Sequence, residues 1–393
     1  MGMNDTPVSE RVHISFFGCR NAGKSSLLNA VTGQQMAVVS AVKGTTTDPV
    51  HKTMELLPAG PVVITDTPGL DDEGALGQKR VEAALRVLYT TDVAVIVMDA
   101  AVGKSPRDEQ ILQTVRERKI PFIEVYNKAD LIPAGSRREG LTYVSAVTGE
   151  GVTALKERIA ALAAANAGEK PIVGDLVKKG DFAVLVVPID KAAPKGRLIL
   201  PQQQVIRDLL EHGAVPVVVK DSELQSVVER LGNQIALVIT DSQVFGKVAS
   251  ILPADMPLTS FSILFSRYKG ELHDQLEGVK ALDSLQNGDT VLISEGCTHH
   301  RQCGDIGTVK IPALLRRYTG REIAVEVTSG KEFPEDLTKY KLIIHCGGCM
   351  LTEKEMKARI ASAREQGVPI TNYGMVLAMG SGILKRSIEP LGL

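Results

Sequence analysis

A phosphate-binding loop near the N-terminus constrains the fold of this chain more than any other feature. The stretch Gly18-Cys-Arg-Asn-Ala-Gly-Lys-Ser25 lies between an apolar segment, residues 13–17, and a helical pattern over residues 25–31. A glycine loop in that context lets backbone amides and a helix N-terminus surround phosphate groups. Apolar segments and helical patterns alternate up to residue 165, which predicts an α/β domain with a mainly parallel sheet.

Two further motifs indicate that the nucleotide is a guanine nucleotide. Asn127-Lys-Ala-Asp130 favours guanine, because the Asp130 carboxylate can accept hydrogen bonds from the ring N1–H and the N2 amine. Ser145-Ala146 fits the loop that supports the base. The nucleotide-binding set predicted for GTP and GDP consists of Gly18, Asn21, Ala22, Gly23, Lys24, Ser25, Ser26, Thr45, Thr46, Asp66, Asn127, Lys128, Asp130, Ser145 and Ala146.

The residues expected to act in hydrolysis are Lys24, Thr46, Asp66 and Gly69. Lys24 would reach the β- and γ-phosphates, while Ser25 and Asp66 would hold Mg²⁺ from two sides. The Gly69 amide would contact the γ-phosphate. Thr46, in the expected first switch loop, would bind Mg²⁺ only when GTP is present. Related GTPases with a Gly-Thr-Thr segment use the second threonine in this way, and Thr45 is the alternative.

Two residues suggest how hydrolysis is assisted. Leu70 stands where Ras-like proteins carry the glutamine that positions water, so unassisted hydrolysis should be slow. The stretch from Gly18 to Ser25, with Asn21 in it, resembles the potassium-activated GTPases of the Era and tRNA-modification class. In those proteins the asparagine ligates a K⁺ ion that takes the place of an arginine finger. Asp71, Asp72 and Glu73 could orient the water, but their spacing selects none of them.

A second group of reactive side chains lies far along the chain. Cys297-Thr-His299 and His345-Cys-Gly-Gly-Cys349 supply three thiolates and two imidazoles, and four of the five cysteines fall within residues 297–349. Thiolates bind soft or borderline metals. The predicted metal ligands are Cys297, Cys346, Cys349, His299 and His345, besides Ser25 and Thr46 for Mg²⁺. The residues alone leave two readings equally open, a structural zinc site and three corners of a 4Fe-4S cluster.

Length and composition bound the organisation of the chain. With 393 residues it suits two or three domains, and we expect them at 1–168, 175–260 and 261–393. The net charge of -1 and the aromatic content of 4% argue against a nucleic-acid partner. No apolar run approaches the roughly 20 residues of a membrane span. The N-terminus carries no secretory pattern, so a cytoplasmic location without membrane contact is expected.

Taken together, these motifs resemble the HydF family, the maturation GTPases of FeFe-hydrogenase with an Era-like, potassium-activated type of GTPase domain. The resemblance covers the whole chain in domain order and favours iron-sulfur over zinc. It implies a GTP-binding domain, a small α/β dimerisation domain that forms a homodimer, and an α/β domain that binds a 4Fe-4S cluster. Cys297, Cys346 and Cys349 match the cluster cysteines, and His299 and His345 match histidines whose role as ligands varies.

The resemblance also implies a role and partners. The family acts as scaffold and carrier for the di-iron subcluster precursor, which is built with the radical-SAM maturases HydE and HydG and delivered to apo FeFe-hydrogenase. GTP turnover would regulate the exchange of partners. This sequence has Gly304 where family members place an acidic residue, with Asp305 one position later, so the fourth cluster ligand stays open among His299, His345, Asp305 and water.

Two other classes of function are compatible with the motifs. One is an Era-like GTPase that acts on RNA or the ribosome and carries a structural zinc domain. The other is a sensor in which the metal site controls GTP turnover. Metal identity separates the scaffold from the first alternative, and cluster transfer to apo-hydrogenase separates it from the second.

Overall fold

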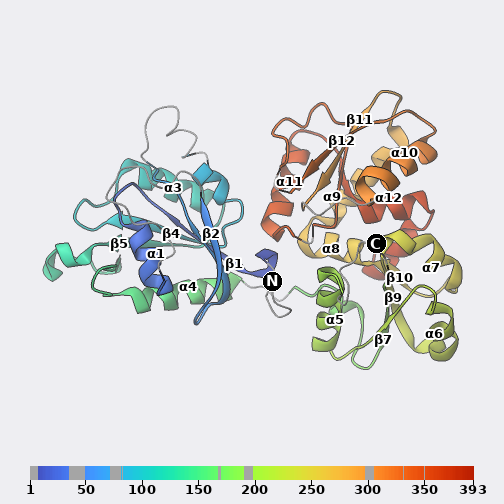
Figure 1. The fold of residues 1–393 in the computed structure, drawn as a ribbon, viewed down its shortest axis with the longest axis horizontal. Helices are drawn as coiled ribbons and strands as arrows, with labels where there is room; N and C mark the ends of the chain where they lie inside the picture. Colours follow the sequence, from blue (N-terminus) through green and yellow to red (C-terminus); the bar gives the residue numbers. More distant parts are fainter. Residues whose placement is uncertain are drawn as a thin grey trace. The chain divides into compact units, whose positions relative to one another are not determined.

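The computed structural model divides into two compact units, residues 1–169 and 170–393, which are described separately (Figure 1). It describes residues 8–34, 49–70, 81, 83–166, 170–189, 198–296, 305–330, 332–348 and 350–393. Within these ranges, no helix is both long enough and apolar enough to cross a lipid bilayer.

The first unit contains a six-stranded sheet with the order β2-β3-β1-β4-β5-β6. All neighbouring strands are parallel except β2 and β3, which pair antiparallel. The strands are β1 (Val12–Phe17), β2 (Val50–Leu56), β3 (Gly60–Asp66), β4 (Val93–Asp99), β5 (Phe122–Asn127) and β6 (Thr142–Tyr143). The predicted α/β domain with a mainly parallel sheet is therefore confirmed.

Helices cover both faces of this sheet (Figure 1). The helices with described bounds are α1 (Lys24–Thr32), α3 (Pro106–Glu117) and α4 (Val152–Asn166). Successive residues of a strand point to opposite faces, so Phe16 packs with α1 and α4 while Phe17 packs with α3. Because both faces are buried, β1 reads as a continuous apolar run, and this explains why the sequence predicts it.

The second unit contains two four-stranded parallel sheets, with the orders β10-β9-β7-β8 and β12-β11-β13-β14. Their strands are β7 (Phe182–Val186), β8 (Val215–Val219), β9 (Ile235–Thr240), β10 (Leu258–Ser260), β11 (Thr290–Glu295), β12 (Ala324–Ser329), β13 (Leu342–His345) and β14 (Ile370–Asn372). The helices are α5 (Leu200–Glu211), α6 (Leu224–Leu231), α7 (Phe245–Ile251), α8 (Phe261–Lys269), α9 (Leu272–Val279), α10 (Ile311–Thr319), α11 (Glu353–Glu365), α12 (Tyr373–Gly380) and α13 (Leu384–Ile388).

One apolar core joins the two sheets of the second unit. Val184 of β7 and Ile293 of β11 belong to the same buried cluster, together with Ile263 of α8. Phe265 of α8 belongs to a separate buried cluster, together with Leu185 of β7 and Val205 of α5. Residue 261, the expected start of a third domain, is the first residue of this shared helix, and the three-domain division stays a prediction.

Candidate functional site

The phosphate loop runs from β1 to α1, and two of its glycines are required by close contacts. Gly18 has φ 146°, and a Cβ atom there would lie 2.1 Å from the Val97 carbonyl oxygen of β4. Gly23 has φ 82°, and a Cβ atom there would lie 2.3 Å from Asn127 Nδ2. No side chain fits at either position, so the loop packs directly on the neighbouring strand and on the guanine motif.

Lys24 places a positive charge inside the loop. Its side chain is buried, and its Nζ donates to the carbonyl oxygens of Gly18 and Cys19, each at 2.9 Å. The first turn of α1 presents its amide groups to the same loop. A buried ammonium next to a helix N-terminus is an arrangement suited to phosphate oxygens.

The predicted Mg²⁺ ligands lie next to each other at the start of α1 and the end of β3. Ser25 Oγ donates to Asp66 Oδ2 at 2.7 Å. Burial raises the pKa of the Asp66 carboxyl, while the Ser25 hydrogen bond and the Lys24 charge lower it. Asp66 Oδ1 is buried and has no hydrogen-bond partner within the described chain. An unpaired carboxylate oxygen beside a serine hydroxyl fits Mg²⁺, which takes oxygen ligands. Thr45 and Thr46 lie outside the described residues.

Asn127 connects the guanine motif to two other loops. Its side chain is 1% exposed; Nδ2 donates to the Ala22 carbonyl at 3.0 Å, and Oδ1 accepts from the Ala146 amide at 3.1 Å. Ser145 Oγ donates to Asp130 Oδ1 at 2.5 Å, which orients the carboxylate expected to read guanine. Hydrogen bonds therefore link the phosphate loop, the guanine motif and the loop that contains Ser145 and Ala146.

Lys128 and Leu70 each contact a neighbouring part of the nucleotide site, Lys128 through an ion pair and Leu70 through its backbone amide. Lys128 has φ 62°, and its Nζ forms an ion pair with Asp99 Oδ2 at 2.6 Å, at the end of β4. The Leu70 amide donates to the Gly18 carbonyl at 3.3 Å, while its side chain is buried in the apolar cluster under α3. The apolar character of residue 70 is thus used in packing. Asp71, Asp72 and Glu73 lie outside the described residues.

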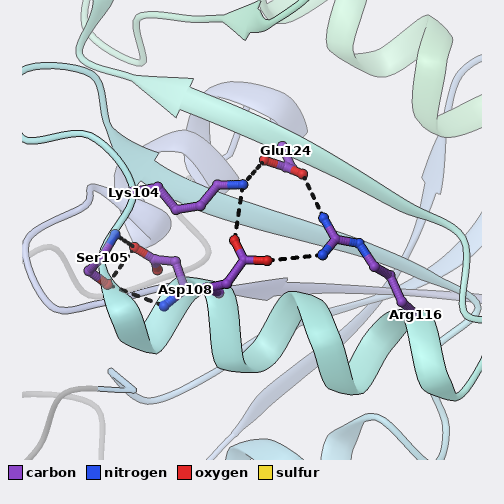
Figure 2. A network of polar contacts seen from close by, with 6 residues as sticks. Lys104, Ser105, Asp108, Arg116 and Glu124 are labelled. Carbon is purple, nitrogen blue, oxygen red and sulfur yellow. Dashed lines mark hydrogen bonds and ion pairs between the residues drawn. The ribbon is translucent and has the colours of Figure 1, made fainter.

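The N-terminus of α3 is anchored by the polar network in Figure 2. Ser105 and Asp108 cap the helix reciprocally, and Lys104 and Arg116 both reach Glu124 on β5, at 2.7 and 3.5 Å. The side chains of this ion network lie near the surface, where each pair contributes little to stability. The network joins α3 to β5.

Cys19 packs against this helix terminus. Its Sγ lies 3.2 Å from Ser105 Oγ and 3.6 Å from Asp108 Oδ1. A pocket of about 310 Å³ lies next to it, and its lining includes Cys19, Ser105, Asp108 and Asn21. Asn21 itself is exposed and has φ 60°. The cysteine is therefore a packed side chain under the loop, as its small size suggests.

The second candidate site lies in the second unit at the carboxyl edge of a parallel sheet. β11 and β13 are adjacent, with Ser294 opposite His345. The Cys346 Sγ accepts hydrogen bonds from the Gly296 amide at 2.9 Å and the Gly348 amide at 3.4 Å. Gly296 directly precedes Cys297, so the segments that carry the two cysteine motifs meet here. Backbone amides directed at a sulfur favour its thiolate form.

Only part of the predicted ligand set can be placed. Cys297, His299 and Cys349 lie outside the described residues, and within the described ranges no three His, Cys, Asp or Glu side chains form a metal-binding group. Asp305 is described: its Oδ2 accepts from the Thr308 amide at 3.0 Å and caps the following turn.

His345 is buried, and both of its ring nitrogens have partners. Nε2 lies 2.9 Å from Arg359 Nη1, and Nδ1 lies 2.8 Å from the Cys346 carbonyl oxygen. A guanidinium only donates hydrogen bonds, so Nε2 accepts and Nδ1 carries the proton. Burial, and next the Arg359 charge, lower the pKa of His345 to about 3. The imidazole is therefore neutral at physiological pH.

Sequence reasoning missed two buried groups beside this site. Arg359 is 7% exposed on α11, where it shares the buried face with Met356, Ile360 and Ala363. A charge inside an apolar stripe at helical spacing is the sequence signal that could have revealed it. Glu295, at the end of β11, is also buried, and it accepts from Tyr373 Oη at 3.5 Å. No feature of the sequence distinguishes Glu295 from an ordinary strand-end residue.

Three protein-family profiles match the chain and together cover most of it. Residues 13–128 match the family described as 50S ribosome-binding GTPase. Residues 172–270 match the Hydrogen maturase F dimerization domain, and residues 273–390 match the Hydrogen maturase F tetramerization domain. The last two profiles alone cover more than half of the chain. A tetramerization domain was not expected from the sequence, which predicted a dimer.

Two curated GTPases match part of the chain. GTPase Der of Kosmotoga olearia is 34% identical over 31% of this chain and 29% of its own length. The tRNA modification GTPase MnmE of Dichelobacter nodosus is 33% identical over 42% of this chain and 38% of its own length. The chain thus spans about a third of the length of these relatives.

Solved structures also resemble part of the chain. The crystal structure of Aquifex aeolicus Era bound to GDP and AlF4⁻ covers 57% of this chain and 98% of its own, at 22% identity and a TM-score of 0.35. The family profile and the curated relatives show that the N-terminal domain is a GTPase domain.

Proposed function

Because the chain belongs to the hydrogen maturase F family, we propose that it is a GTPase scaffold and carrier in the maturation of FeFe-hydrogenase. One observation carries the proposal. A single chain combines a guanine-nucleotide site with a cysteine site whose two segments converge on the Cys346 sulfur. Neither alternative class of function requires both sites together with the two Hydrogen maturase F domains.

The nucleotide chemistry follows from the residues of the first unit. Lys24 would bind the phosphates, Ser25 and Asp66 would hold Mg²⁺ together with Thr46, and Asp130 would select guanine. Bound Mg²⁺ would supply positive charge to the β- and γ-phosphate oxygens as the bond between the γ-phosphoryl group and GDP breaks. The Leu70 side chain is buried and does not orient water. Asn21, exposed on the loop, is the residue that would ligate K⁺ and so accelerate hydrolysis.

The cysteine site suits a 4Fe-4S cluster by its donor set. Cys297, Cys346 and Cys349 are the proposed ligands, and the amides of Gly296 and Gly348 support the Cys346 thiolate. The cluster that these thiolates would hold would carry the di-iron subcluster precursor. Three cysteine ligands leave one iron open to an exchangeable ligand, which suits a site that passes its cargo on.

The proposed partners follow from family membership. HydE and HydG would supply the precursor and apo FeFe-hydrogenase would receive it, in the cytoplasm. The dimerization and tetramerization domains support self-association of the chain. GTP turnover would regulate the exchange of these partners.

The decisive experiment is metal analysis of anaerobically purified protein, with EPR after reduction. About four irons and four sulfides per chain with a 4Fe-4S signal would support the carrier, and transfer to apo-hydrogenase would be the next assay. One zinc per chain and no iron would refute it. That result would favour the Era-like GTPase with a structural zinc domain that acts on RNA or the ribosome.

A further inference from the structure

A single guanidinium ties together three strand ends at the cysteine site. Arg359 Nη1 donates to Ser294 Oγ at 3.2 Å and lies 2.9 Å from His345 Nε2, and Nη2 donates to the Gly330 carbonyl at 2.9 Å. Ser294 belongs to β11, His345 ends β13 and Gly330 directly follows β12. Two of these strands, β11 and β13, lead directly into the cysteine motifs.

Arg359 is a buried cation whose hydrogen-bond partners are neutral groups. It is 7% exposed, and its guanidinium lies 5.1 Å from the centre of the Phe333 ring. Among the described residues, no carboxylate forms an ion pair with it. Burial lowers the pKa of Arg359, while the charges of Glu355, one helical turn away, and of Cys346 raise it without forming an ion pair. A buried charge without a direct ion pair is costly, so a further anion nearby would stabilise it. A cluster ligated by thiolates is such an anion.

The contact with Arg359 determines what the His345 ring can do. Arginine stays protonated and offers donors alone, so it occupies the Nε2 lone pair that a metal would need. The other nitrogen, Nδ1, donates its proton to the carbonyl of Cys346. The ring therefore supports the backbone of a ligating residue and has no lone pair free for iron.

We propose that Arg359 is a positioning residue of the cysteine site, an inference that rests on the proposed function. By holding His345 Nε2, Arg359 keeps the imidazole out of the iron coordination. Its charge stabilises the reduced, more negative form of the cluster. The open iron is then left to a ligand other than His345.

The test uses the full-length chain, reconstituted anaerobically with iron and sulfide. The variants are Arg359→Gln, Arg359→Lys and His345→Gln. Lys357→Gln is the matched control, because it removes a positive charge from the same helix at a side chain that is 45% exposed and paired with Glu353. The readouts are iron content, the reduction potential, and nitrogen couplings in pulsed EPR of the reduced cluster.

We expect wild-type protein and His345→Gln to show the same nitrogen couplings, whichever other residue supplies the fourth ligand. In Arg359→Gln the ratio of reduced to oxidised cluster at a fixed potential should fall on the order of tenfold, which is about 59 mV for one electron. Arg359→Lys keeps the charge and should retain most of the wild-type potential. Lys357→Gln should leave it unchanged.

Loss of a directly bound nitrogen in His345→Gln would overturn the proposal, and so would an Arg359→Gln potential equal to that of the control. The comparison of wild type with His345→Gln tests the coordination even if Arg359→Gln fails to fold. Wild-type protein that binds no iron would instead refute the proposed function, and this inference with it. The two failures are therefore distinguishable.

Discussion

Replacing Asn127 with alanine should reveal how strongly the three nucleotide-binding loops depend on one side chain. The amide is 1% exposed and joins the Ala22 carbonyl to the Ala146 amide, at 3.0 and 3.1 Å. Truncation leaves both backbone groups without their partner. An unsatisfied buried polar group costs about 1–3 kcal/mol. Since Ala146 is half-buried and water can replace part of its bond, we expect the first unit to lose about 2–4 kcal/mol of unfolding free energy.

The control is Gln113→Ala, which also removes an amide from the first unit. Gln113 is exposed and donates to Glu117 Oε1 at 2.9 Å on α3. Its loss should cost less than about 0.5 kcal/mol. Urea unfolding followed by hydrogen exchange of peptides from residues 8–166 reports the first unit separately from the second. GTP affinity should fall at least about tenfold in Asn127→Ala alone, equivalent to about 1.4 kcal/mol.

Equal stability of the two variants would refute the hydrogen-bond argument. A loss shared equally by both units would refute the premise that the effect is local. A loss of stability with unchanged GTP affinity would show that the amide supports the fold of the loops without shaping the nucleotide site.

Four other perturbations test the two sites. Lys24→Ala should abolish GTP binding, because it removes the central cation of the loop, yet leave the iron content unchanged. Fluorescent-nucleotide titration measures the binding and iron analysis measures the metal, and a loss of iron would contradict the independence of the two sites. Cys346→Ala should lose iron and keep GTP turnover within about twofold, which is below 0.5 kcal/mol in activation free energy; a large change in phosphate release would favour the sensor alternative. Replacing K⁺ by Na⁺ should slow hydrolysis in wild type and have no effect in Asn21→Ala; equal wild-type rates in the two salts would remove the role of K⁺. The folded-state pKa of His345, about 3, lies below the ordinary value of 6.5, so the unfolded state binds a proton that the folded state does not as pH falls. The cluster-free second unit should therefore lose about 2 kcal/mol of unfolding free energy between pH 7 and pH 5, measured by urea unfolding, and His345→Gln should lose correspondingly less. The same pH dependence of stability in both proteins would contradict a buried neutral imidazole.

The nucleotide site could be predicted because its chemistry depends on short motifs in a regular context. Gly18 and Gly23 must be glycine where the loop touches Val97 and Asn127, and these requirements leave a visible spacing in the sequence. The edge strand β2 was missed for the opposite reason. Of its seven residues only Leu56 is buried, so no apolar pattern marks it. The short strand β6, with two half-buried residues, gives no pattern either.

The cysteine site could be predicted only in outline. The rule that ligands gather at the carboxyl ends of parallel strands suggested that the two motifs meet, and the contact between Gly296 and the Cys346 sulfur joins the segments. The sequence could not assign a role to His345, because a histidine beside a cysteine is equally compatible with a ligand and with a supporting donor. That role depends on Arg359, which is 14 positions away in sequence.

By itself, the sequence determined the class of the N-terminal domain and its guanine nucleotide, and it predicted a cysteine site, because each of these depends on residue types at fixed spacing. The tertiary structure alone decided which buried groups share a hydrogen bond. Arg359 reaches three strands whose order in the sheet, β12-β11-β13, differs from their order in the chain. Partners of that kind are selected by distance in space and by the cost of leaving a buried charge or donor unpaired. Both the distances between residues and the cost of an unpaired buried group depend on the folded structure.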